Sequence, residues 1–297
     1  MRALLACAGL AAAVFTAQAQ TATTGLQLSH DSDGLDQQQL TVGATASSGW
    51  GLKTGALRYR AVGGWTAHGE TLAATYLLAS ETTHLDASAG ASRIGKHMHA
   101  VGTLDWWHSL GAASSMGLSA ERNLVDSQPG IEAGLVYDSL ALVADHAFSD
   151  RYDVGLAGGS TWFSDGNHRP FLRTRWNAGL EANIGLNAYV KTRSYWNSSA
   201  HRPEYFSPER LNEVSLGLSS RFVVAGGVVV SAAVDAGRQY TEAGTEPIWS
   251  GSIGVSSTRG ASPSCALTLQ TANTAGLLSG SPTYRYTSLS GRLSVPF

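Results

Sequence analysis

The sequence predicts an all-β fold, a transmembrane antiparallel β-barrel of about sixteen strands whose two ends lie in the periplasm. Most of the chain divides into segments in which apolar and polar residues alternate, as they do along a strand with one face in lipid and the other in water. The connections between these segments are alternately long and short. The last segment ends at Phe297, with Leu289, Leu293 and Val295 on the same face as this aromatic residue. Together these features favour a closed barrel over a soluble β-sandwich.

The amino-terminal residues predict export. Met1 and Arg2 supply a positive start, an uncharged apolar run follows from Ala3 to Phe15, and Ala17-Gln18-Ala19 has the small-x-small pattern of a cleavage site. The apolar run is too short to serve as a stable membrane anchor. The predicted organisation is therefore a secretory signal peptide over residues 1–19 and an outer-membrane barrel over residues 20–297.

Composition agrees with an exported barrel. Charged residues make up 14% of the chain, the mean hydropathy is −0.05 and the formal net charge is −2. Averaging over strands that are apolar outside and polar inside gives such intermediate values. The balance of charge provides no basic footprint, so nucleic acid is excluded as a partner. Cleavage of the signal would leave only Cys265, so no intrachain disulfide is expected.

About sixteen segments are predicted to be strands, most of them roughly ten to fourteen residues long. Their even number returns both ends of the chain to one side of the membrane. The predicted strands are Thr23–His30, Gln37–Ala46, Gly51–Val62, Thr66–Ala79, Thr82–Arg93, His97–Ser109, Met116–Arg122, Leu135–Phe148, Tyr152–Phe163, Pro170–Ala182, Gly185–Trp196, Arg210–Val224, Val228–Tyr240, Ile248–Ser257, Ser264–Asn273 and Tyr284–Phe297.

The connections set the orientation. Those after odd-numbered strands include the longest, above all Asn197–Glu209, whereas those after even-numbered strands are mostly tight turns such as Asn183-Ile184. Outer-membrane barrels have short periplasmic turns and longer external loops. The pattern therefore places both chain ends in the periplasm and Asn197–Glu209 outside the cell.

The alternation also assigns side chains to the lumen. In one segment Leu172 and Trp176 oppose Arg173 and Arg175, and charged residues collect on one face in several others, while Lys53 interrupts the pattern. Two interpretations stay open: a ladder of ion pairs that fills the lumen, or a pore wall that contacts a polar or charged solute. The residues expected to face the lumen and contact the solute are Arg58, Arg60, Arg173, Arg175, Tyr189, Lys191, Arg193 and Asp235.

No specific catalytic motif is present. The sequence has no Gly-x-Ser-x-Gly nucleophile elbow and no His-Glu-x-x-His. His97-Met98-His99 places two imidazoles on one face of a strand, but no acidic or thiol residue lies nearby in sequence to complete a metal site. We therefore expect no enzyme activity, no catalytic residues, no metal and no cofactor.

Two loop segments are distinctive. Phe163–Arg169 contains the turn formers Asp165, Gly166 and Asn167, and Tyr205–Arg210 leads into a predicted strand. With Glu121–Asp126, they resemble the carboxy-terminal outer-membrane porin domain of the bacterial exopolysaccharide export proteins that secrete poly-N-acetylglucosamine and cellulose. The loop residues of interest, which have either a structural role or a role in gating the pore, are Asp165, Gly166, Asn167, Arg169, Tyr205, Pro208 and Arg210.

The resemblance implies a sixteen-stranded channel that exports an exopolysaccharide. Its partners would be outer-membrane lipid, the polysaccharide, and the barrel assembly machinery, which would recognise the strand ending at Phe297. Family members carry a periplasmic array of tetratricopeptide repeats, for which this sequence shows no helical repeat. A separate periplasmic scaffold or synthase complex would then be a further partner. The alternatives are a general small-solute porin and a plugged structural or adhesive barrel.

Overall fold

The computed structural model describes residues 19–224, 227–257, 263–274 and 284–297. The predicted signal peptide therefore lies outside the described residues, apart from Ala19, which begins the first strand. Among the described residues, no helix is long and apolar enough to span a membrane.

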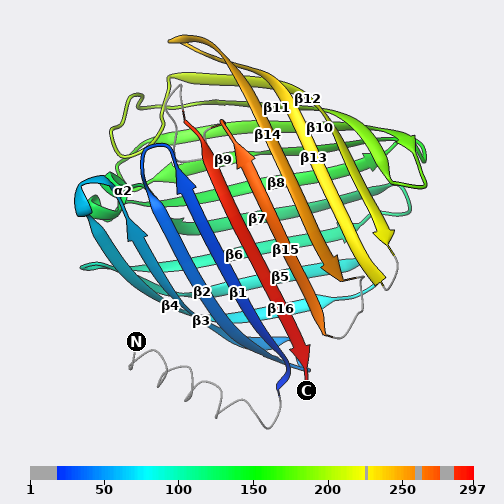
Figure 1. Ribbon diagram of the computed structural model, residues 1–297, viewed down its shortest axis with the longest axis horizontal. Helices are drawn as coiled ribbons and strands as arrows, with labels where there is room; N and C mark the ends of the chain where they lie inside the picture. The colour runs from blue at the N-terminus through cyan, green and yellow to red at the C-terminus, as the bar shows by residue number, and fades with distance from the viewer. Residues whose placement is uncertain (1–18, 225–226, 258–262, 275–283) are drawn as a thin grey trace.

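The described chain forms one closed antiparallel barrel in which the first strand pairs with the last (Figure 1). This confirms the predicted all-β barrel. Its strands are β1 Ala19–Asp31, β2 Asp36–Ala46, β3 Trp50–Arg60, β4 Thr66–Ala79, β5 Thr83–Ile94, β6 His97–Ser109, β7 Ser114–Leu124, β8 Val136–Ala147, β9 Tyr152–Phe163, β10 His168–Glu181, β11 Leu186–Trp196, β12 Arg210–Val224, β13 Val228–Thr241, β14 Gly244–Ser257, β15 Ser264–Ala272 and β16 Tyr286–Pro296.

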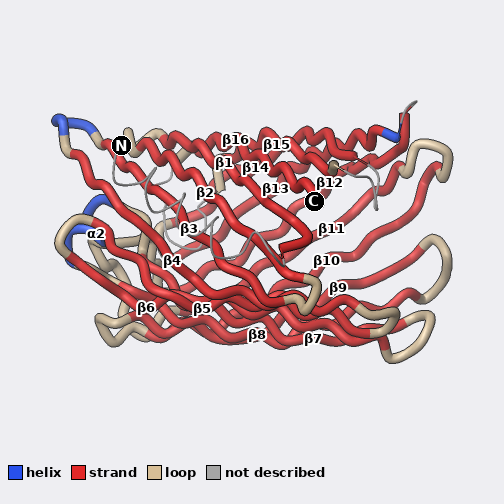
Figure 2. The backbone as a smooth tube through the Cα atoms, turned by 90° about the horizontal axis from the view of Figure 1, so that it is seen from below, coloured by secondary structure: helices blue, strands red, loops and turns tan. Residues whose placement is uncertain are grey.

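The connections gather at the two ends of the strands (Figure 2). One end carries the connections that follow odd-numbered strands, including residues 125–135 and 197–209, and the other carries short turns such as residues 182–185. The start of β1 and the end of β16 lie at the short-turn end, where the Phe297 N–H donates to the Gln20 carbonyl at 3.1 Å. For an outer-membrane barrel, the long-loop end is the external mouth.

The barrel has an apolar outer face and a polar lumen along most strands. On β10, the outward Leu172 and Trp176 are about half exposed, whereas Arg173 and Arg175 between them point into the lumen. Side chains of residues paired in register share a face. The strand pairing therefore assigns the side chains of each strand to the outer face or to the lumen, all around the closed sheet.

At the end of strand β3 near the external mouth, the apolar residues face the lumen and the charged residues face outward, which corrects the predicted positions of Arg58 and Arg60. Leu57 and Tyr59 are buried in the lumen, so Arg58 and Arg60, which alternate with them, point outward. Arg58 pairs in register with Gln38, on the same face as the exposed Leu40. The expectation that both arginines line the lumen is therefore wrong. The physical reason is that an apolar structure inside the mouth covers this part of the wall.

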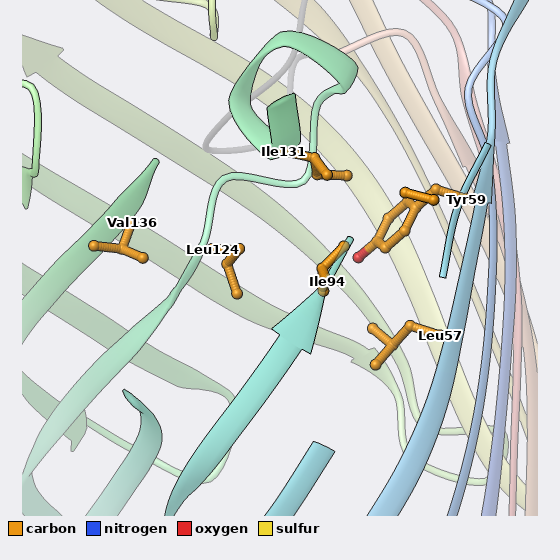
Figure 3. Packing of buried hydrophobic residues seen from close by; sticks show 7 residues of the cluster. Leu57, Tyr59, Ile94, Leu124, Ile131 and Val136 are labelled. Carbon is orange, nitrogen blue, oxygen red and sulfur yellow. The ribbon is translucent and has the colours of Figure 1, made fainter. Parts of the chain in front are cut away.

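That structure is the short helix α2, Gln128–Ala133, which the sequence analysis did not predict. Ser127 caps its first turn by accepting from the Gly130 N–H, and Gly134 ends it in the left-handed conformation. Ile131 projects from the helix toward Tyr59 and Ile94, with Leu57 beside them (Figure 3). The 125–135 connection is thus held against the inner wall at the mouth.

Candidate functional site in the lumen and at its mouth

Four basic residues on two neighbouring strands form a continuous patch in the lumen. Arg173 lies directly across from Arg193, and Arg175 directly across from Lys191, in the register of β10 and β11. We call these four residues the basic band. Like charges in directly opposed cross-strand positions repel one another. The band therefore requires neighbouring groups that offset its charge.

On the β11 side, carboxylates of the next strands neutralise the band. Arg193 makes a two-pronged ion pair with Glu213 of β12, with nitrogen–oxygen distances of 2.7 and 2.6 Å. Lys191 Nζ lies 2.7 Å from Asp235 of β13, which also accepts from the Tyr189 hydroxyl at 3.1 Å. Each basic side chain of β11 is thus paired with a carboxylate, so the net charge of this part of the lumen is small.

The β10 side of the band is different, because no carboxylate in the described part of the chain forms a salt bridge with Arg173 or Arg175. The Arg175 guanidinium carbon lies 3.9 Å from the centre of the Tyr189 ring, and its Nε donates to Asn177 at 2.9 Å. Arg173 lies over the Phe171 ring at 5.0 Å. Both side chains are exposed to the lumen, where their charge is available to a solute.

Acidic residues occupy the neighbouring wall. The register places Asp86 of β5 directly across from Asp105 of β6, both on the lumen face, and Glu121, Asp145 and Asp153 face inward on β7 to β9. Ser119 donates to Asp105 at 2.7 Å. The lumen therefore has an acidic wall over β5–β9 beside the basic band. The sequence analysis did not select Asp86 and Asp105, although their position in the alternation would have found them.

At the mouth, Arg169 organises the loop after β11. Its side chain is fully buried, with Nε donating to Asn197 Oδ1 and a terminal nitrogen donating to the Phe206 carbonyl, both at 2.7 Å. Its guanidinium also lies over the rings of Tyr195 and Tyr205, at 4.6 and 5.5 Å. One arginine thus joins the base of the 197–209 loop to its far limb.

The two distinctive loop segments meet at this point. Asn167 donates to the Tyr205 hydroxyl at 2.9 Å, and that hydroxyl in turn donates to Asp165 at 3.1 Å. The Tyr205 ring stacks on Phe163 with centroids 4.2 Å apart. Gly166 takes the turn at φ 88°. We call Asp165, Asn167, Arg169, Asn197 and Tyr205 the mouth cluster.

The cluster connects the 197–209 loop to the helix inside the mouth. Tyr205 belongs to a buried apolar group with Val125, Leu135, Tyr137 and Phe163. Ser127, the cap of α2, donates to the Glu204 carbonyl. Within the 197–209 loop, the Asn197 side chain donates to the Pro208 carbonyl. The two longest described connections therefore pack on each other across part of the opening.

A carboxylate on the neighbouring turn fastens the far limb of the loop. Glu242, between β13 and β14, accepts from the backbone N–H groups of Glu209 at 2.9 Å and Arg210 at 3.4 Å. His201 Nε2 lies 3.7 Å from the same carboxylate. Partial burial acts to raise the pKa of Glu242, but the backbone hydrogen bonds outweigh burial and hold this pKa below its ordinary value. Arg210 therefore helps to hold the loop through its backbone N–H, which donates to Glu242.

Acid is expected to release this fastening. Because the Glu242 pKa is lowered when the loop is closed, the stabilisation is complete above the ordinary glutamate pKa and is lost as pH falls through the lowered value. We expect single-channel recordings to show more frequent opening below about pH 4. The Glu242→Ala variant should open as often at neutral pH as the wild type does in acid. An acid response that persists unchanged in that variant would contradict the assignment.

The histidine pair contributes to structure. The His97 and His99 rings stack with centroids 5.9 Å apart, and His97 Nε2 donates to the Glu132 carbonyl of α2 at 3.1 Å. Within the described ranges, no group of three or more histidine, cysteine or acidic residues is arranged to hold a metal ion.

No protein-family model matches the chain, and no curated protein matches it in sequence. Among solved structures, the chain is similar to one described as a bacterial polysaccharide outer membrane secretin, with a TM-score of 0.71 and 13% identity over 93% of this chain and 98% of that chain. It is also similar to CdiB from Acinetobacter baumannii, with a TM-score of 0.52 and 11% identity over 93% of this chain and 60% of that one.

These likenesses identify the fold as that of a bacterial outer-membrane β-barrel. They confirm the predicted resemblance at the level of the barrel, and the bacterial outer membrane is the location of such a fold. The roles of the lumen and loop residues stay predictions, which the geometry above makes testable.

Proposed function

We propose that this barrel is an outer-membrane channel that exports an exopolysaccharide. The observation that carries the proposal is a cavity of about 630 Å³ inside the mouth, beneath the 197–209 loop. Its lining combines the partly exposed aromatic residues Phe206 and Tyr286 with the acidic and amide groups of Asp33 and Gln239. Aromatic faces beside hydrogen-bonding groups suit a hydrated, hydroxyl-rich chain, since sugar rings present both apolar faces and hydroxyls.

The lumen supports the same proposal. Along the basic band, Arg173 and Arg175 are exposed and retain free hydrogen-bonding capacity, while the buried Tyr189 ring supports the Arg175 guanidinium. A polar wall of this kind replaces part of the hydration shell of a passing solute. Passage requires no covalent chemistry. The solved structure with a TM-score of 0.71 is described as a polysaccharide outer membrane secretin, which supports the same proposal.

A tethered mouth tests export directly. The Ser127→Cys/Glu204→Cys variant, with Cys265→Ser to remove the exposed free thiol, places a disulfide where the two loops touch. In cells that lack the chromosomal gene, the untethered chain should restore secretion of a matrix polysaccharide. The oxidised variant should not restore it, and reductant should recover secretion. Deletion that leaves the secreted polysaccharide unchanged would contradict export.

One observation favours a second candidate, a plugged structural barrel. The loops at the mouth bury a fully inaccessible arginine and a compact apolar group, as a permanent cover would. This alternative predicts no ion conductance in planar bilayers, even after the loop contacts are broken. A small-solute porin would instead conduct ions without loss of any polymer when the gene is deleted.

A further inference from the structure

A second concave surface lies on the outer wall of the barrel, and at the rim it reaches Ile131 and Glu132 of α2. It is a hollow of about 930 Å³ over β1 to β5 near the external mouth. From β1 it takes Leu26 and Leu28, which point outward, and it leaves out Gln27, which lies between them and points inward. On β1 the hollow therefore opens toward the surrounding membrane, while its far end meets the rim of the mouth.

The lining changes from apolar to basic along the strands. Leu26, Leu40 and Ala56 lie in one register row and form an apolar floor. From Ala56 toward the external mouth, the next two outward residues of β3 are Arg58 and then Arg60. With about 3.4 Å per residue, the step from Ala56 to Arg60 covers roughly 14 Å along the strand. This is the order in which a lipid presents acyl chains and then its headgroup.

The basic end has spare capacity for an anion. Among the described residues, Arg58 Nε is inaccessible to solvent and has no hydrogen-bond partner. Its register neighbour on β4 is His68, and Lys96 lines the same hollow from the turn after β5. Two acidic residues also line the hollow. Glu70 faces Arg93 at 3.4 Å, so its charge is offset locally, and Glu132 of α2 accepts a hydrogen bond from Gln128. A buried, unpaired guanidinium donor is costly. No described carboxylate forms a salt bridge with Arg58, so the charge of its guanidinium is not offset within the protein.

We propose that this hollow binds a phosphorylated, multiply acylated lipid of the outer leaflet. The phosphate accepts from Arg58, with Arg60 and Lys96 adding positive charge around it. The acyl chains lie on the floor made by Leu26, Leu40 and Ala56. Such a lipid also covers the outward charges of β3, which bare hydrocarbon would not tolerate. The arginines that the sequence pattern assigned to the lumen thus acquire a role on the opposite face.

Native mass spectrometry of the purified full-length protein, titrated with diphosphorylated lipid A, tests this site. We expect one tightly bound lipid, with binding weakened about tenfold in Arg58→Gln/Arg60→Gln, the change expected for loss of one charge-assisted hydrogen bond. Ala56→Trp fills the floor without altering charge, and it should weaken binding as well. The matched control is Arg238→Gln, an outward arginine on β13, which should bind as the wild type does.

Three results would overturn the proposal. Lipid A binding that is equal in the wild type and in Arg58→Gln/Arg60→Gln would remove the phosphate contact. Equal binding of a dephosphorylated lipid with the same acyl chains would do so too, and equal binding of phosphatidylglycerol would remove the preference for many chains. Heat-dependent mobility on gels establishes that each variant is a folded barrel before titration.

Discussion

Replacing Arg169 by methionine is expected to release the 197–209 loop and raise the single-channel conductance. The substitution keeps an apolar stem but leaves Asn197 Oδ1 and the Phe206 carbonyl without a buried charged donor. It also removes the cation from above three aromatic rings. Losing a buried, hydrogen-bonded charge of this kind costs about 3 kcal/mol. We expect that loss to appear in the closing of the loop, because the barrel hydrogen bonds are untouched.

The control for this prediction is Arg202→Met in the same loop. Arg202 is partly exposed and approaches Asp165 only at 3.4 Å, so its removal should change conductance little. Conductance would be measured in planar bilayers, and loop release by protease cleavage between residues 197 and 209. If Arg169→Met leaves both the conductance and the cleavage rate at their wild-type values, Arg169 does not hold the mouth closed.

Neutralising Arg173 and Arg175 together is expected to move the ion selectivity of the channel toward cations. These side chains have no carboxylate partner among the described residues, so their removal leaves the acidic wall of β5–β9 unopposed. We expect the chloride-to-potassium permeability ratio to fall on the order of threefold in the Arg173→Gln/Arg175→Gln variant. The reversal potential in a potassium chloride gradient provides this ratio.

The correction on β3 supplies a control of matched charge. Arg58→Gln/Arg60→Gln also removes two positive charges, but from the outer face of the barrel. Its reversal potential should equal that of the wild type. Equal shifts in the two double variants would show that the selectivity follows total charge and that the basic band has no special position.

Most of the barrel could be predicted from sequence because a strand that separates lipid from water must alternate. Even the lumen position of Arg173 and Arg175 follows from the apolar Leu172 and Trp176 around them. The prediction failed at β3, where Leu57 and Tyr59 face inward. Alternation alone gives two faces without saying which is inside, and here a helix in the lumen reverses the usual polarity.

The structure of the mouth was harder to predict, because its helix has a weak local signal and its contacts join residues that are distant in the sequence. Helix α2 is only six residues long and contains both Pro129 and Gly130, so its local signal is that of a turn. The contacts of Arg169 with Asn197 and Phe206 join residues that are 28 and 37 positions apart in the chain. The distinctive loop residues Asp165 and Tyr205 were visible in the sequence, but the hydrogen bond between them required the folded loop.

Current recordings in the presence of a linear glycan test the central claim most directly, that a carbohydrate chain passes through this lumen. Oligomers of N-acetylglucosamine added to one side of a bilayer that holds open Arg169→Met channels should interrupt the current for times that depend on oligomer length. The Arg173→Gln/Arg175→Gln change in the same background should alter the length of these interruptions. A steady ion current that long oligomers never interrupt would contradict polysaccharide passage.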